Sequence, residues 1–141
     1  MPKAQPTFPI HLDKKAFAET IKSAKAVTAL PKAGVRMLLV PNPDGGADAT
    51  PFCHEQGPNT ICKINSTLQS DGSFGFACQC KSTTPPGGPG SPGGSLTPKP
   101  CILTSSTRCL KLDCRGTCER VYIQKTVLGH ALFVIACRCT P

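Results

Sequence analysis

The first part of the chain carries apolar residues at helical spacing. Asp13 is a candidate N-cap, and Pro31 should end the helix because proline lacks the N–H group that a helix interior requires. The expected apolar stripe is narrow, with basic side chains around it, and consists of Phe17, Ile21, Ala24 and Thr28. This pattern predicts a helix that lies on the body of the protein or on a neighbouring molecule.

β-Strands are predicted where short apolar runs end at turn-forming residues. Residues 35–40 form one such run, which closes at Pro41 and is followed by an irregular loop through residue 46. Two later segments have the composition of β-hairpins, with turns at residues 70–72 and 128–130. The chain therefore begins with a helix–strand arm and continues into two hairpins.

Eight of the ten cysteines form two series with closely similar spacing. The first two cysteines of each series are nine positions apart, and each series ends in the pattern Ala-Cys-x-Cys. Only the central interval differs, by three residues, which a longer hairpin would explain. The series are Cys53, Cys62, Cys78 and Cys80, and Cys109, Cys118, Cys137 and Cys139. This periodicity predicts two duplicated cysteine-hairpin modules.

Six proline and five glycine residues occupy the twenty positions of segment 81–100. No packed core can be built from this composition, so the segment is expected to be a linker. The predicted organisation is a helix–strand arm and loop at 1–52, a first cysteine-hairpin module at 53–80, the linker, and a second module at 101–141. We expect deletion of residues 1–40 to abolish assembly with other molecules while leaving both modules folded.

The cysteines are better explained by disulfides than by metal binding. Hydrophobic residues make up 39% of the chain and aromatic residues 5%, which is little material for a core, and disulfides stabilise such chains. The C-x-x-C spacing typical of structural zinc sites does not occur in the sequence. The predicted fold class is therefore small, mainly β and disulfide-rich, with no cofactor and no metal. An intracellular cysteine-based metal-binding protein is the second alternative to the functions considered below, and it predicts ten free thiols after denaturation and stoichiometric metal.

The repeat restricts how the cysteines pair. A bridge within a C-x-C pair would be strained, so each module should join its first two cysteines to its last two. The hairpin turns set which residues lie opposite one another, and the two cysteines without a counterpart in the first module are left to pair together. The predicted bridges are Cys53 with Cys78, Cys62 with Cys80, Cys109 with Cys137, Cys118 with Cys139, and Cys101 with Cys114.

The net charge of +8 is unevenly distributed, with +5 in residues 1–40, −1 in 41–100 and +4 in 101–141. No cluster of five basic residues occurs and aromatic residues do not alternate with basic ones, so nucleic-acid binding is not expected. The apolar runs are too short for a membrane span. The N-terminus shows no apolar core of a secretory signal, yet the predicted disulfides place the protein outside the cell or at its surface.

No catalytic set of residues can be assembled from the sequence. The three histidines lie in unrelated contexts, and the acidic residues are few and scattered. A calcium site at Asp44 and Asp48 is not favoured, because the loop lacks the alternating acids of an EF-hand. We therefore predict that the protein is not an enzyme. Asn65 begins the triplet Asn65-Ser66-Thr67, a possible glycosylation site in a secreted protein.

The second hairpin is unusually apolar, and both faces of its last strand require cover. Either the N-terminal arm or another subunit could supply that cover. The candidate assembly residues are Phe17 and Ile21 of the arm and Val121, Ile123, Leu132, Phe133, Val134 and Ile135 of the hairpin.

The first functional hypothesis is a non-enzymatic extracellular or cell-surface structural subunit. It would self-assemble into a filament or coat, with copies of itself or another surface protein as partners. The alternative is a soluble secreted disulfide-rich binding protein of the toxin, inhibitor or defence type, whose basic C-terminal module contacts an acidic target.

Overall fold

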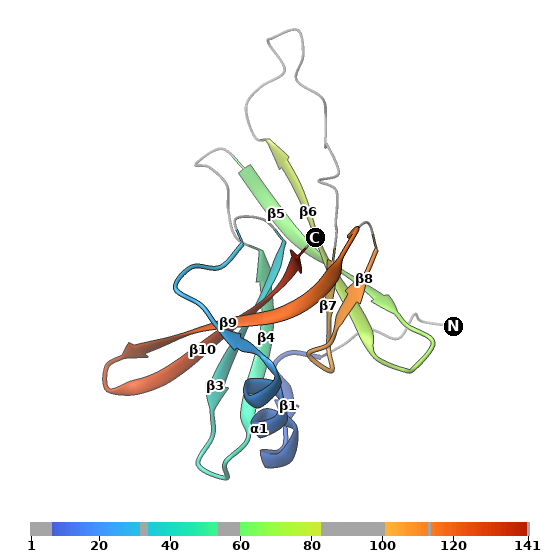
Figure 1. Ribbon diagram of the computed structural model, residues 1–141. Helices are drawn as coiled ribbons and strands as arrows, with labels where there is room; N and C mark the ends of the chain where they lie inside the picture. Colours follow the sequence, from blue (N-terminus) through green and yellow to red (C-terminus); the bar gives the residue numbers. More distant parts are fainter. Residues whose placement is uncertain (1–6, 32–33, 54–59, 83–100, 113, 141) are drawn as a thin grey trace, which may run out of the picture.

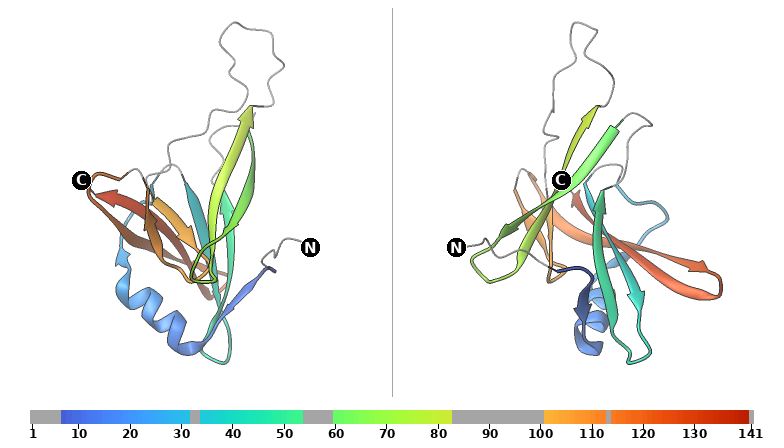
Figure 2. Two further views of the ribbon diagram at one scale, coloured as in Figure 1. Left: turned by 90° about the vertical axis from the view of Figure 1, so that its right-hand side faces the viewer. Right: turned by 180° about the vertical axis from the view of Figure 1, so that it is seen from behind.

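The computed structural model describes residues 7–31, 34–53, 60–82, 101–112 and 114–140. Within these ranges the chain forms ten strands and one helix (Figure 1). The strands make two β-sheets that share one hydrophobic core, and Figure 2 shows them from two further sides. The prediction of a small, mainly β, disulfide-rich fold is confirmed.

The larger sheet has six strands in the order β1-β4-β3-β10-β9-β2. Neighbouring strands are antiparallel, except that β2 runs parallel to β9. The predicted strand at residues 35–40 is confirmed as β3, and it lies between β4 and β10 rather than at an edge. The strands are β1 Ile10–Leu12, β2 Lys25–Ala26, β3 Val35–Pro41, β4 Ala47–Cys53, β9 Thr117–Val127 and β10 His130–Thr140.

The smaller sheet has four antiparallel strands in the order β5-β6-β7-β8. Both predicted hairpins are present, as β5–β6 and β9–β10. However, β7 and β8 come from the predicted second module and extend the β5–β6 hairpin of the first, so the two modules share a sheet. Duplication itself stays a prediction. The strands are β5 Thr60–Leu68, β6 Phe74–Ser82, β7 Cys101–Thr104 and β8 Cys109–Lys111.

Helix α1 spans Lys14–Ser23. Asp13 is its N-cap as predicted, and its side chain accepts a hydrogen bond of 2.7 Å from the backbone N–H of Ala16. The helix does not continue to Pro31, because the backbone becomes extended at Ala24 and the next two residues pair with β9 as strand β2. The edge of β9 offers these residues backbone hydrogen bonds that the apolar spacing of the sequence did not reveal.

The hydrophobic core draws on both sheets and on the N-terminal arm. Its buried members are Leu12, Met37, Leu39, Ala47, Ala49, Phe76, Leu103 and Ile135. Three of them, Leu12, Met37 and Leu39, lie within residues 1–40. Deletion of this segment would therefore remove most of β3, which lies in the middle of the larger sheet. We therefore no longer expect the modules to stay folded without residues 1–40, and predict that this deletion unfolds them.

Candidate functional site

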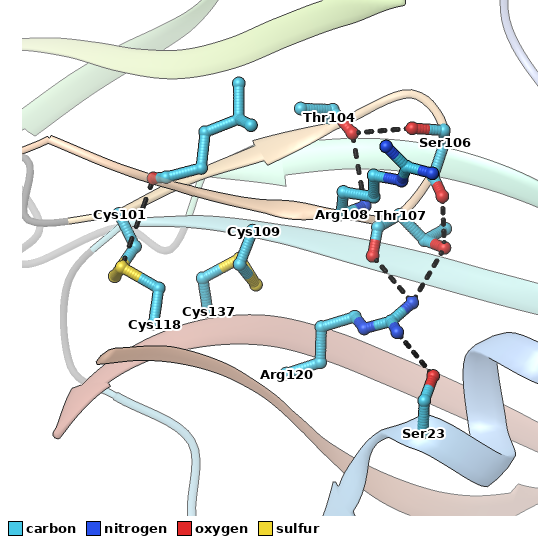
Figure 3. The surroundings of a disulfide bond; sticks show 11 residues. Ser23, Cys101, Thr104, Ser106, Thr107, Arg108, Cys109, Cys118, Arg120 and Cys137 are labelled. Atoms are coloured by element: carbon cyan, nitrogen blue, oxygen red, sulfur yellow. Dashed lines mark hydrogen bonds between the residues drawn. A yellow bond between two sulfur atoms is a disulfide. The ribbon is translucent and has the colours of Figure 1, made fainter.

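Three disulfides join the larger sheet to the smaller one. Each links a strand of one sheet to a strand of the other, with Cα separations of 5.7–5.9 Å that are typical of disulfides. Figure 3 shows two of them side by side with the polar residues nearby. They join Cys53 on β4 to Cys78 on β6, Cys101 on β7 to Cys118 on β9, and Cys109 on β8 to Cys137 on β10.

Two predicted bridges are confirmed, and they are Cys53–Cys78 and Cys109–Cys137. The register that places Cys62 opposite Cys80 is also confirmed, and Cys62 is disulfide-bonded. The side chain of Cys80 lies outside what the structure describes, so the bridge between these two cysteines stays a prediction.

The other two predicted bridges are wrong. Cys118 does lie opposite Cys139 in the β9–β10 register, but it bonds Cys101, and Cys139 bonds Cys114. Residues opposite one another in an antiparallel pair project from the same face of the sheet. Here that face is turned toward the smaller sheet, where β7 brings Cys101 within bonding distance of Cys118.

The sulfur atoms of three cysteines lie close together where β7 of the smaller sheet faces β9 of the larger one, a place called the junction below. The Sγ atoms of Cys101, Cys114 and Cys118 all lie within 4.8 Å of one another, and the side chain of Cys114 is buried. Because these sulfurs belong to the Cys101–Cys118 and Cys114–Cys139 bridges, they are not free thiolates that could ligate a metal in this state. The junction is therefore a pair of adjacent disulfides.

Polar contacts beside the disulfides tie α1 to both sheets (Figure 3). Arg120 on β9 donates a hydrogen bond of 3.1 Å from Nη1 to the carbonyl oxygen of Thr107, in the β7–β8 turn, and another from Nη2 to Ser23 Oγ. Burial lowers the pKa of Arg120 from its ordinary value, and the charge of Arg108 lowers it further. Sequence reasoning missed this network, because none of its residues has a diagnostic spacing.

The candidate assembly residues lie mostly inside the chain's own fold. The rings of Phe17 and Phe133 contact one another edge to face, with their centroids 5.6 Å apart. The N-terminal arm itself therefore covers this part of the second hairpin. Ile21 also packs against the core, and Ile123 and Leu132 are half-buried. The remaining three candidates, Val121, Val134 and Ile135, are buried.

The end of the β9–β10 hairpin projects beyond the rest of the larger sheet (Figure 1). Within β10, only residues 133–136 pair with β3. Strand β9, in contrast, pairs with β10 as far as the hairpin turn. At this turn Leu128 is 93% exposed and Val127 is 48% exposed. Leu128 has a φ of 52°, in the left-handed region that favours glycine or asparagine. The turn is therefore unusual both in its conformation and in its exposed apolar side chains.

A second exposed surface is the open edge of β5, where two apolar side chains accompany polar ones. Among the described residues β5 pairs only with β6, and its side chains Ile61 and Leu68 are 55% and 57% exposed. Asn65, the possible glycosylation site, lies exposed on the same strand and donates a hydrogen bond of 2.9 Å to Gln79 Oε1. The strand therefore presents backbone groups, apolar side chains and this amide together.

Exposed polar contacts link β1 to β4 and to the β3–β4 turn. The ring of His11 lies 3.6 Å from an oxygen of Asp44 and 3.3 Å from an oxygen of Asp48. Asn42 Nδ2 donates a hydrogen bond of 3.0 Å to the same Asp48 oxygen. These hydrogen bonds, that of Asn42 first and that of His11 second, lower the pKa of Asp48.

No helix in the described part of the chain is long and apolar enough to cross a membrane. Comparison with known proteins finds no significant match to a family model, to a curated protein or to a solved structure.

Proposed function

We propose that the protein is a non-enzymatic extracellular structural subunit that self-associates through the open edge of β5. The observation that carries this proposal is a nine-residue strand with no second neighbour among the described residues and with Ile61 and Leu68 exposed near its ends. The open edge of a strand offers unpaired backbone groups to another strand, and exposed apolar side chains favour that contact. In an antiparallel contact between two copies, the Ile61 end of one strand would meet the Leu68 end of the other.

The disulfides support both the extracellular location and the presentation of this edge. Bridges of this kind persist in oxidising compartments and are rare where thiols are kept reduced. They also join the two sheets at three places, so β5 belongs to a framework that is covalently held in position. The apolar residues first considered for assembly are buried or half-buried in the chain's own fold, so we place the proposed contact at β5.

The test is sedimentation equilibrium of the full chain over a wide range of concentrations. We expect the unaltered protein to self-associate and the double variant Ile61→Lys with Leu68→Lys to remain monomeric, because charged side chains on an edge strand oppose its pairing with another strand. Leu112→Lys is the matched control, since Leu112 is 54% exposed and the change adds the same side chain. A monomeric unaltered protein, or dissociation by the control as well, would contradict the proposal.

A second candidate function is supported by the β9–β10 turn. A soluble secreted binding protein of the toxin, inhibitor or defence type would use Leu128 and Val127 as an apolar contact. Residues 120–141 contain no acidic side chain, so the matching target is an acidic surface with an apolar pocket. This candidate predicts a monomer in the sedimentation experiment and binding that weakens as salt is added.

The described cysteines are in disulfides, whereas the alternative of an intracellular metal-binding protein predicts free thiols, so this alternative stays a prediction without support from the cysteines.

A further inference from the structure

We propose that the adjacent bridges Cys101–Cys118 and Cys114–Cys139 form a thiol-reactive site. A small-molecule thiol would exchange this pairing for a second one, in which Cys101 bonds Cys114 and Cys118 bonds Cys139. The inference rests on the placement of four sulfur atoms and is independent of the proposed function.

The first requirement is that a thiolate released from one bridge can reach the other. The Sγ atoms of Cys101, Cys114 and Cys118 lie within 4.8 Å of one another. A thiolate on Cys101 would therefore need to move only a short distance to attack Cys114 Sγ. Among the described residues this is the one place where sulfur atoms of three cysteines meet.

The second requirement is that the alternative bridge fits the backbone. Cys118 and Cys139 are directly opposite partners in the β9–β10 pairing. Opposite residues of antiparallel strands have Cα atoms about 4.5–5.5 Å apart, which falls within the range of about 4.4–6.8 Å found for disulfides. The two pairings close loops of similar length, so chain entropy gives little preference between them.

The exchange proceeds by three thiolate displacements and needs no net oxidant or reductant. The external thiolate attacks Cys118 Sγ, forming a mixed disulfide and releasing Cys101 as a thiolate. Cys101 then attacks Cys114 Sγ, which forms the Cys101 to Cys114 bond and releases Cys139. Cys139 finally attacks the mixed disulfide at Cys118 Sγ, which forms the last bond and returns the external thiolate.

Exposure supports entry at the Cys101–Cys118 bridge. Both of these cysteines are half-buried, whereas the other bridge joins half-buried Cys139 to buried Cys114, so an external thiolate finds two partly exposed cysteines at the first bridge and one at the second. Exchange would replace a bridge between the two sheets by one within the β9–β10 hairpin. Strand β7 would then lose its covalent tie to β9, while the Cys109–Cys137 bridge still joined the sheets. The site would thus set how firmly the sheets are held together.

The experiment incubates the folded full chain with a mixture of reduced and oxidised glutathione. After acid quenching and alkylation, trypsin separates the six cysteines of residues 101–141, because a lysine or arginine lies between each cysteine and the next. We expect peptides that link Cys118 to Cys139, and Cys101 to Cys114, to appear together, with the Cys109 to Cys137 link unchanged. Absence of the Cys118 to Cys139 peptide would overturn the proposal, as would equal scrambling of Cys109 and Cys137.

A double variant tests whether the bridge between Cys118 and Cys139 can form in the absence of an external thiol. Cys101→Ser with Cys114→Ser leaves Cys118 and Cys139 without their present partners, and we expect them to bond, so that the variant gains no alkylated thiols. The control is Cys101→Ser with Cys118→Ser, which retains the Cys114–Cys139 bridge. A folded first variant with two alkylated thiols would overturn the proposal. If that variant does not fold, the peptide map of the unaltered chain still decides.

Discussion

The hydroxyl oxygens of Thr20 and Thr107 lie 2.7 Å apart where α1 meets the β7–β8 turn. Both side chains are buried, at 3% and 1% exposure, and the residues are 87 positions apart in the chain. Thr20 Oγ1 also lies 2.8 Å from the carbonyl oxygen of Ala16 and can donate to it, so the two hydroxyls form a short hydrogen-bonded chain. This contact joins the arm to a turn that comes from the far end of the sequence.

We expect Thr20→Val to destabilise the protein by about 1–2 kcal/mol, because a buried hydroxyl loses its partner while the shape of the side chain is retained. Urea denaturation measures the free energy of unfolding. Thr28→Val is the control, because Thr28 is exposed. Equal effects of the two changes would mean that the buried hydrogen bond contributes nothing.

The side chain of Arg120 should also stabilise the junction. Arg120→Met keeps the aliphatic length but removes the hydrogen bonds to Thr107 and Ser23. Burial of the charge opposes these bonds, as the lowered pKa of Arg120 indicates, so we expect a net loss of about 1 kcal/mol. Arg120→Lys should also destabilise the protein, but by less than Arg120→Met, since lysine lacks the planar fork that reaches both acceptors. A more stable methionine variant in urea denaturation would contradict this expectation.

At the β9–β10 turn we expect a substitution to stabilise the protein. Leu128→Asn places a residue that tolerates a φ of 52° before Gly129, the sequence that two-residue hairpin turns prefer. The expected gain is about 1 kcal/mol, the cost of the left-handed conformation for an ordinary side chain. Thermal unfolding measures it, and Leu128→Ala is the control because alanine keeps the unfavourable conformation. A lower melting temperature for the asparagine variant would show that Leu128 contributes to the fold.

The N-terminal arm should contribute directly to stability. Phe17→Ala removes the edge-to-face contact with Phe133 and opens space against the core. We expect a loss of about 2 kcal/mol, below the value for a fully buried phenylalanine because Phe17 is half-buried. Phe52→Ala is the control, because Phe52 is 36% exposed. An unchanged free energy of unfolding for Phe17→Ala would contradict this expectation and would support the earlier view that the modules fold without residues 1–40.

Acid should weaken the contacts of Asp48. The carboxyl group has a lowered pKa in the folded protein, with Asn42 as the largest cause. Its contribution to stability is therefore fully present above its unfolded pKa, about 3.9, and is lost as the pH falls through the folded pKa. We expect Asn42→Ala to raise the pKa of Asp48 in a carboxyl NMR titration. The exposed Asp71, whose pKa is lowered by Ser73 instead, should not change.

Several strands could be predicted because their signals are local. The β5–β6 and β9–β10 hairpins follow from β-branched and aromatic runs on either side of turn residues, and β3 follows from a short apolar run. Strand β4 could not be found in this way. Its buried face consists of Ala47, Ala49 and Pro51, residues with little strand preference, and pairing with β3 decides its conformation. The end of α1 was missed for the same reason, because β9 competes for the residues after Ala24.

The cysteines show where local information ends. Hairpin turns set the register within a pair of strands, so the sequence alone was enough to place Cys62 opposite Cys80 and Cys118 opposite Cys139. The partner of Cys118 depends instead on which strand of the second sheet faces it, and that follows from packing both sheets around one core. Turn geometry acts over a few residues, whereas the facing of two sheets depends on contacts between distant parts of the chain.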